Sequence, residues 1–120
     1  MSVLSVVLVF LGGGCGAALR FGVHELFKHF GWIERFPWHT FAINVLGSFA
    51  LGVFAALCKD RPLFLLLGTG LCGGFTTFST FSYETLQLLE SGRWPVAGAY
   101  VLGSVSAAMI GVTIGYGMAR

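Results

Sequence analysis

At residues 70–82 the chain reads GLCGGFTTFSTFS, a run of glycines, hydroxyl side chains and phenylalanines that holds no charged residue. The run lies inside a longer uncharged stretch, residues 62–83. That stretch can cross a hydrocarbon core, because about 20 helical residues span roughly 30 Å. A glycine pair followed by β-branched threonines weakens the helical hydrogen-bond ladder, and backbone groups freed at bilayer depth must face protein or a polar cavity. The segment therefore predicts a membrane-spanning helix with a break near its centre.

Three further uncharged stretches, at residues 1–19, 36–58 and 94–119, are similar in kind. The chain is 56% hydrophobic and 10% charged, with a mean hydropathy of +0.84, which excludes a water-soluble surface. We read the first stretch as a retained helix and not a signal peptide, because no Lys or Arg precedes its apolar run. We predict a single all-α integral membrane domain over residues 1–120, with transmembrane helices at about residues 3–27, 38–57, 63–90 and 95–119.

Soluble functions find no support in the sequence. The net charge is +2, and no basic patch with interleaved aromatic residues indicates a nucleic-acid partner. The three cysteines have no metal-ligand spacing and are interpreted as small buried hydrophobic residues. The three histidines have neither a triad partner nor metal spacing, and no phosphate-binding loop is present. We therefore expect no enzyme activity and no nucleic-acid binding.

The distribution of Lys and Arg predicts an unusual topology. One predicted side carries Lys59, Arg61 and Arg120, and the other carries Lys28, Arg35 and Arg93, with Arg20 counted as intramembrane. Because the Lys/Arg imbalance sets orientation, a three-to-three tie favours insertion in both directions. Two such chains could pair antiparallel, as a dual-topology homodimer about a twofold axis in the membrane plane. The alternative is that other factors fix one orientation.

Small residues recur at the spacing that brings helices close together. They are Gly12 and Gly16, then Gly70 and Gly74, and finally Gly103, Ala107, Gly111 and Gly115. Helix association in lipid rests on packing, so these residues predict close helix contacts. Because a four-helix monomer is too slim to hold much of a pore, they also favour a homodimer.

The predicted break offers two kinds of ligand. Carbonyl groups freed near Gly73 to Thr76 would form an oxygen-lined site for a hard cation such as Na⁺. The alternative is a glycine packing face whose threonines bond back to their own helix. Phe75, Phe78 and Phe81 recur every third residue and would stack along one face, where ring edges could meet an anion. The alternative is that they are ordinary core or lipid-facing residues.

Polar residues occur in the other spans as well. Thr40, Asn44 and Ser48 share one helix face, and Tyr100 and Ser104 form a second four-spaced pair. Asn44 could bridge helices or present its NH₂ group to a permeating ion, and the sequence leaves both open. Two charges, Arg20 and Glu84, lie near span ends. Arg20 could attract anions at a vestibule, whereas Glu84 would repel them, so a vestibule position or a contact with Arg20, Lys28 or a threonine is expected.

Three motifs together resemble the CrcB/Fluc fluoride channel family. They are GGCGAALRF at residues 13–21, NVLGS at residues 44–48 and GGFTTFSTFSYE at residues 73–84. The resemblance covers essentially the whole chain. It implies an antiparallel, dual-topology homodimer with two pores in the cell (inner) membrane. Such a channel exports F⁻ passively, lowers its cytoplasmic concentration and holds one structural Na⁺ at the dimer centre.

The resemblance also implies roles for particular residues. Asn44 resembles the pore asparagine, and Phe78 and Phe81 resemble the phenylalanines that line the fluoride path. The carbonyl groups of Gly73 and Thr76 match the Na⁺ ligands, four oxygens once both subunits contribute. The remaining matches are the vestibule position of Arg20 and the polar pathway positions of Thr40, Thr80, Tyr100 and Ser104.

Two other functions compete with this reading. A small dual-topology multidrug exporter would need a carboxylate near the middle of the first helix, where no acid precedes Glu25. A membrane subunit that transports nothing and only packs against a partner would leave Asn44 and the break in the third span without a purpose.

Overall fold

The computed structural model describes residues 2–32 and 35–120, and every regular element within those ranges is helical. The first, second and fourth spans are α1 (Val3–His29), α2 (Trp38–Leu57) and α6 (Trp94–Ala119). The third span is divided into α3 (Arg61–Phe64), the π-helix η1 (Leu65–Cys72), α4 (Gly73–Phe75) and α5 (Ser79–Glu90). Over the described residues, four spans are long and apolar enough to cross a membrane, which confirms the prediction of four transmembrane helices.

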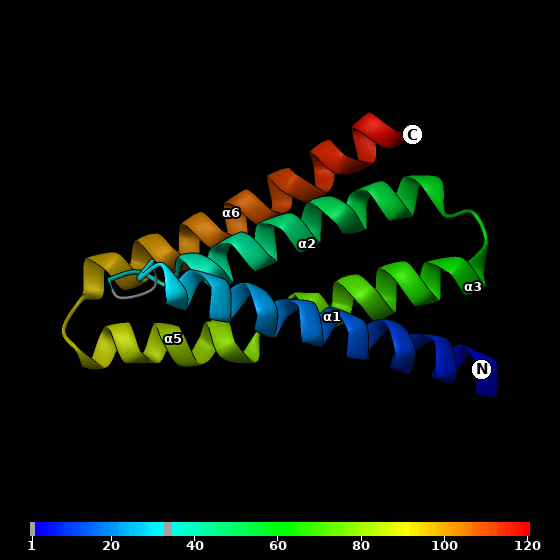
Figure 1. Ribbon diagram of the computed structural model, residues 1–120. Coiled ribbons are helices and arrows are strands. Elements are labelled where there is room, and N and C mark those ends of the chain that lie inside the picture. The colour runs from blue at the N-terminus through cyan, green and yellow to red at the C-terminus, as the bar shows by residue number, and fades with distance from the viewer. Residues whose placement is uncertain (1, 33–34) are drawn as a thin grey trace.

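The spans run along the long axis of a bundle whose extents are 47 × 28 × 27 Å. Figure 1 shows both termini at one end, together with the connection from α2 to α3. The connections from α1 to α2 and from α5 to α6 lie at the opposite end. Consecutive spans are therefore antiparallel, and the basic residues near the span ends divide between the two ends as the sequence predicts.

Local sequence explains where the helices begin and end. The Ser2 side chain accepts a hydrogen bond from the Ser5 N–H at 3.1 Å and so caps the start of α1. Gly31 follows α1 with φ 72°, and Gly92 follows α5 with φ 78°. A glycine adopts this left-handed conformation without steric cost, so each one ends a helix and turns the chain toward the next span.

Glycines bring the helices together in two pairs. A side chain at Gly12 would collide with the backbone of Leu71 and Gly70, and one at Gly74 would collide with the backbone of Gly13. These contacts hold α1 against η1 and α4. The second pair is α2 with α6, where a side chain at Gly52 would meet Val112 and Tyr116. At Gly103, in contrast, an added Cβ meets nothing within 4 Å, so this glycine is not a contact between helices of the same chain.

The third span is interrupted as predicted, but the interruption begins slightly later. The Gly73 N–H donates to the carbonyl of Gly68, five residues back, which is the π-helical pattern of η1. Helical geometry ends at Thr76, whose φ of −78° and ψ of 157° are extended. The break therefore occupies residues 76–78. Phe75, Phe78 and Phe81 consequently do not share one helix face, and that expectation was wrong because the helix does not continue between them.

Candidate functional site

An amide of α2 holds the broken segment. Asn44 Oδ1 accepts a hydrogen bond from the Thr77 N–H at 3.0 Å, and Asn44 Nδ2 donates to the Thr77 carbonyl at 3.3 Å. Asn44 thus satisfies both backbone groups of a residue that has left the helix, as an unpaired backbone group inside the membrane requires. Asn44 therefore bridges α2 and the third span, as one of its two interpretations predicted.

Three further hydrogen bonds complete the break. The Thr80 N–H donates to Thr77 Oγ1 at 3.2 Å, which satisfies a backbone donor in the first turn of α5. The Thr76 hydroxyl donates to the Cys72 carbonyl at 3.0 Å, the back-bonding anticipated for a threonine in this segment. From α1, Arg20 Nε donates to the Gly74 carbonyl at 3.2 Å. Side chains from three spans therefore hold the break.

These bonds deprive two carbonyl groups of their helical donors. In an unbroken α-helix the Thr77 N–H would bond to the Gly73 carbonyl, and the Thr80 N–H would bond to the Thr76 carbonyl. Both N–H groups point elsewhere, to Asn44 and to Thr77 Oγ1. Gly73 lies on an open face of the chain, since an added Cβ would meet only the Gly68 carbonyl, at 4.0 Å. Uncharged backbone oxygens of this kind are suitable ligands for a hard monovalent cation.

Two cavities flank the break, and we name each after one of its residues. The Arg20 cavity has a volume of about 660 Å³, and the Asn44 cavity has a volume of about 570 Å³. The predicted site residues Arg20, Thr40, Thr80 and Glu84 line the first. Asn44, Gly73, Thr76, Phe78, Phe81 and Ser104 line the second. Thr77 lines both cavities, so they meet at the broken segment.

Each cavity has one buried hydroxyl group without a hydrogen-bond partner. These are Thr40 Oγ1 in the Arg20 cavity and Ser104 Oγ in the Asn44 cavity. Thr40 is 0% exposed and Ser104 is 4% exposed. Nearly all buried polar atoms in proteins are hydrogen-bonded. Hydroxyls without a partner on a cavity wall therefore indicate a binding position for a polar ligand or ion. Such groups can donate a hydrogen bond without adding charge.

The aromatic residues of the site differ greatly in their surroundings. Phe81 is buried, with its ring centroid 4.9 Å from that of Tyr100, which is fully buried. Phe78 belongs to the break and is 78% exposed in the single chain, although its ring lies 6.0 Å from that of Phe81. A phenylalanine so exposed at the wall of a cavity needs either lipid or a second protein surface to cover it.

Glu84 has partners that the sequence analysis missed. Its Oε2 lies 2.9 Å from His39 Nε2, and its Oε1 accepts a hydrogen bond from the Tyr100 hydroxyl at 3.0 Å. Of the expected contacts, the one with a threonine is present, since the Thr40 hydroxyl interacts with the Glu84 carboxylate, although without a hydrogen bond of standard geometry. No contact of Glu84 with Arg20 or Lys28 is among the hydrogen bonds and ion pairs of the described residues, where Arg20 is bonded to Gly74 instead. Histidine inside an apolar span was the available signal for His39.

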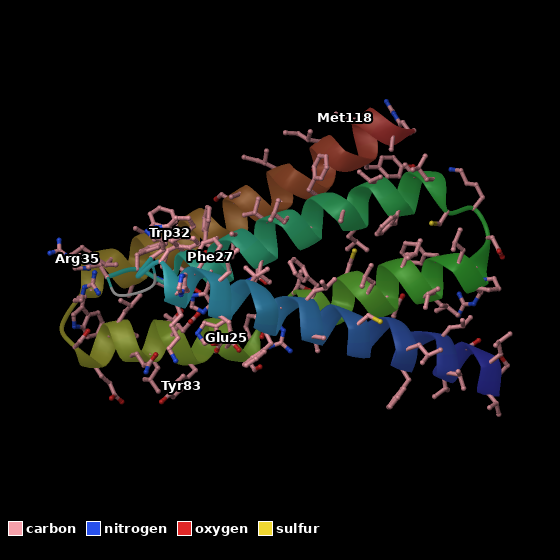
Figure 2. The ribbon with its side chains drawn as sticks, in the orientation of Figure 1. Glu25, Phe27, Trp32, Arg35, Tyr83 and Met118 are labelled. Atoms are coloured by element: carbon pink, nitrogen blue, oxygen red, sulfur yellow. The ribbon has the colours of Figure 1, made fainter. Side chains whose placement is uncertain are left out.

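The Arg20 cavity lies toward the end of the bundle that carries the loop before α2. Figure 2 shows Tyr83 on α5 and Arg35 in that loop at the same end of the molecule, and both residues line this cavity. Arg93, at the start of α6, lines it as well. Among the described residues that line it, the cavity therefore combines cationic residues from α1, from the loop before α2 and from the residue before α6 with one carboxylate, that of Glu84.

The fold and the site together define a four-span membrane protein whose third span is broken beside an intramembrane amide. The family described as CrcB-like protein, Camphor Resistance (CrcB), matches residues 7–116, so the chain belongs to this family. This confirms the family resemblance found in the three sequence motifs.

Several curated relatives match nearly the full chain, and each is named a fluoride-specific ion channel, FluC. The protein from Phocaeicola vulgatus is 46% identical over 120 residues, which cover 97% of this chain and 98% of the relative. The protein from Chloroflexus aurantiacus is 43% identical and covers 97% and 95%. The protein from a Methylobacterium species is 44% identical and covers 98% and 97%. The relatives are thus named as channels and not as enzymes, in agreement with the expectation from the sequence.

Proposed function

We propose that this chain forms a fluoride-selective channel that lets F⁻ leave the cell passively across the cell (inner) membrane and so lowers its cytoplasmic concentration. One observation carries the proposal. Cavities with unpaired, uncharged hydroxyl donors flank a broken span in a chain whose relatives are named fluoride-specific ion channels. Both cavities offer an anion hydrogen bonds at membrane depth.

The chemistry of the lining suits a strongly hydrated anion that must also leave again. Lys or Arg at a constriction would bind F⁻ tightly and slow its release, whereas distributed neutral donors allow entry and exit. Thr40 and Thr80 supply hydroxyls on the Arg20 cavity, and Ser104 supplies one on the Asn44 cavity. Tyr100 is a buried residue of α6, and its hydroxyl already bonds to Glu84 of α5.

Asn44 and the phenylalanines supply the rest of the proposed path. The Asn44 NH₂ group has two donors, and only one is engaged by the Thr77 carbonyl, which leaves the other for an anion. The rings of Phe78 and Phe81 have positive edges that can face a small anion in place of water. Arg20, whose Nε is held by Gly74, keeps four further N–H donors with which to attract anions at the vestibule.

We further propose that two chains form an antiparallel, dual-topology homodimer with two pores. Support comes from the equal count of Lys and Arg at the two ends, from the exposure of Phe78, and from the open faces at Gly73 and Gly103. A partner chain would cover these surfaces. An uncovered π-helix and break are otherwise costly at membrane depth, where freed backbone groups require protein or a polar cavity.

A structural Na⁺ at the dimer centre is the last part of the proposal. The carbonyls of Gly73 and Thr76 from each subunit would hold it, since their helical N–H donors are diverted. Na⁺ would supply a positive charge that fixes these carbonyl dipoles and with them the shape of the break. Within each chain, the bond from the Thr77 N–H to Asn44 orients the peptide unit that also carries the Thr76 carbonyl.

Fluoride efflux from liposomes tests the function. Vesicles that contain the purified protein should release F⁻ down its gradient, while chloride-loaded vesicles and protein-free vesicles should stay tight. Protein prepared wholly without Na⁺ should conduct poorly if the cation is structural. If the chain only packs against a partner, fluoride-loaded vesicles that contain it should release no more F⁻ than protein-free vesicles. That result would refute the proposal.

A further inference from the structure

The Arg20 cavity contains opposing charges whose pairing decides what an anion meets there. Arg20, Arg35 and Arg93 line it, and so does the carboxylate of Glu84. A carboxylate that reached the Arg20 guanidinium would form the strong bidentate pair that these groups favour. That pair would neutralise the cation and occupy its donors. Arg20 can therefore contribute to anion attraction in this cavity only while Glu84 is kept from it.

Both oxygens of Glu84 are engaged on the opposite side, by α2 and α6. His39 Nε2 lies 2.9 Å from Oε2, and the Tyr100 hydroxyl donates to Oε1 at 3.0 Å. His39 is 5% exposed and Tyr100 is 0% exposed, so both donors are fixed by their surroundings. Arg20 meanwhile donates to the Gly74 carbonyl. The two opposite charges face one cavity, yet each is bonded to a different neighbour.

The His39 ring is held by stacking, and Glu84 is the partner of one of its two nitrogens. It stacks on His24 of α1, with centroids 4.5 Å apart and an interplanar angle of 25°. Its Nδ1 is buried without a hydrogen-bond partner, so Nε2 is the only ring nitrogen with a polar contact. Because a carboxylate accepts and does not donate, Nε2 carries the proton in this contact.

We propose that His39 is a positioning residue, which holds the Glu84 carboxylate against α2 and α6 and so leaves the Arg20 guanidinium free for an incoming anion. This inference rests on the proposed fluoride conduction. His39 itself does not touch the anion. When its N–H is lost, Oε2 of Glu84 loses its donor while Oε1 stays bonded to Tyr100. The carboxylate then turns more readily toward the cationic residues of the same cavity, and the cavity attracts F⁻ less strongly.

Two substitutions at His39 form a matched pair. Gln places its amide nitrogen near the position of Nε2, whereas Asn places its amide nitrogen near the position of Nδ1, where no partner exists. His39→Gln should therefore keep flux close to wild type. His39→Asn should raise the fluoride concentration that gives half-maximal flux by about tenfold, the order expected for one hydrogen bond to a charged group, with a smaller effect on maximal flux. Both proteins lose the stacked ring, so that loss cancels in the comparison.

The background variant Glu84→Gln separates positioning from a general structural role. If His39 acts through the Glu84 charge, His39→Asn should have no further effect on the half-maximal concentration in the Glu84→Gln protein. Should His39→Asn not yield folded protein by size-exclusion chromatography, His39→Leu takes its place against His39→Gln. Equal flux curves for Gln and Asn (or Leu), or an undiminished effect in the Glu84→Gln background, would overturn the inference. Absence of fluoride flux in the wild-type protein would instead refute the proposed function.

Discussion

Asn44 and Thr77 are joined by two hydrogen bonds, one from the Thr77 N–H to Oδ1 at 3.0 Å and one from Nδ2 to the Thr77 carbonyl at 3.3 Å. The side chain of α2 therefore replaces two bonds that the third span would otherwise make to itself. This replacement releases the Gly73 carbonyl from its helical donor and places the amide on the wall of the Asn44 cavity. The break and the proposed ion path depend on the same residue.

Asn44→Asp is accordingly expected to abolish most fluoride flux. Aspartate can still accept from the Thr77 N–H, but it presents a second oxygen to the Thr77 carbonyl and adds a negative charge to an anion path. The loss should reach about a hundredfold or more, since an unpaired buried charge costs several kcal/mol. Liposome efflux measures it, with Thr113→Val as the control, because the Thr113 hydroxyl bonds only to its own helix, at Met109. Wild-type flux in Asn44→Asp would show that this amide lies off the path.

Phe78→Ile and Phe81→Ile should each reduce fluoride flux sharply while the protein remains folded. Isoleucine keeps apolar bulk but lacks the ring quadrupole, and apolar swaps of similar volume usually cost less than about 1.5 kcal/mol of stability. Phe10→Ile is a matched control, because Phe10 is 78% exposed in the single chain, as Phe78 is. If all three variants conduct like wild type, the phenylalanines of the break are packing residues.

Gly74→Ala should destabilise the fold, whereas Gly14→Ala should not. A Cβ at Gly74 would collide with the backbone of Gly13, which cannot move aside without separating α1 from the third span, and such overpacking costs about 1–3 kcal/mol. At Gly14, on the same helix as Gly13, an added Cβ meets nothing within 4 Å. Thermal denaturation followed by size-exclusion chromatography should give a lower midpoint for Gly74→Ala alone. Equal denaturation midpoints for the two variants would mean that α1 and the third span can separate at Gly74 with little loss of stability.

Hydropathy was enough to predict the four spans, because each apolar stretch is bounded by charged or turn residues. The predicted start of α2 and the predicted ends of α2, α5 and α6 agree with the structure, and α1 extends two residues further. The π-helix Leu65–Cys72 was not predicted. Its hydrogen-bond pattern is associated with packing of Gly70 on Gly12 of α1, a contact between distant parts of the chain that no local pattern encodes.

The sequence was enough to predict which residues form the candidate site, but not which of them bond to one another. Glycine and threonine content located the break to within a few residues, and the glycine spacings predicted the α1 contacts. The partner of Asn44 could not be deduced, since an amide can bond to any neighbouring span. For Glu84 the threonine contact was expected and is present, with Thr40, whereas the expected contacts with Arg20 or Lys28 were wrong. The structure also pairs it with His39 of α2 and Tyr100 of α6, and only the packing of α2 directly against α6 brings those two side chains to the same carboxylate.

Antiparallel assembly predicts that each connecting loop is found on both sides of the membrane. Single cysteines at Asp60 and Ser91, in a protein whose three native cysteines are replaced by alanine, leave the count of Lys and Arg unchanged. Because the positive-inside rule depends on that count, these variants keep the native bias. A membrane-impermeant thiol reagent should label about half of each cysteine from outside. Complete labelling of one position and none of the other would establish a single orientation.

The central claim, passive and selective fluoride conduction, is tested most directly by the reversal potential of the purified protein in a planar bilayer. With a tenfold fluoride gradient and equal chloride on both sides, a fluoride-selective channel should reverse at about 59 mV, the value for a tenfold gradient of a monovalent ion. The sign should be that of fluoride equilibrium, and the potential should hold when chloride is varied. A reversal potential near zero, or one that follows the chloride gradient, would contradict the account.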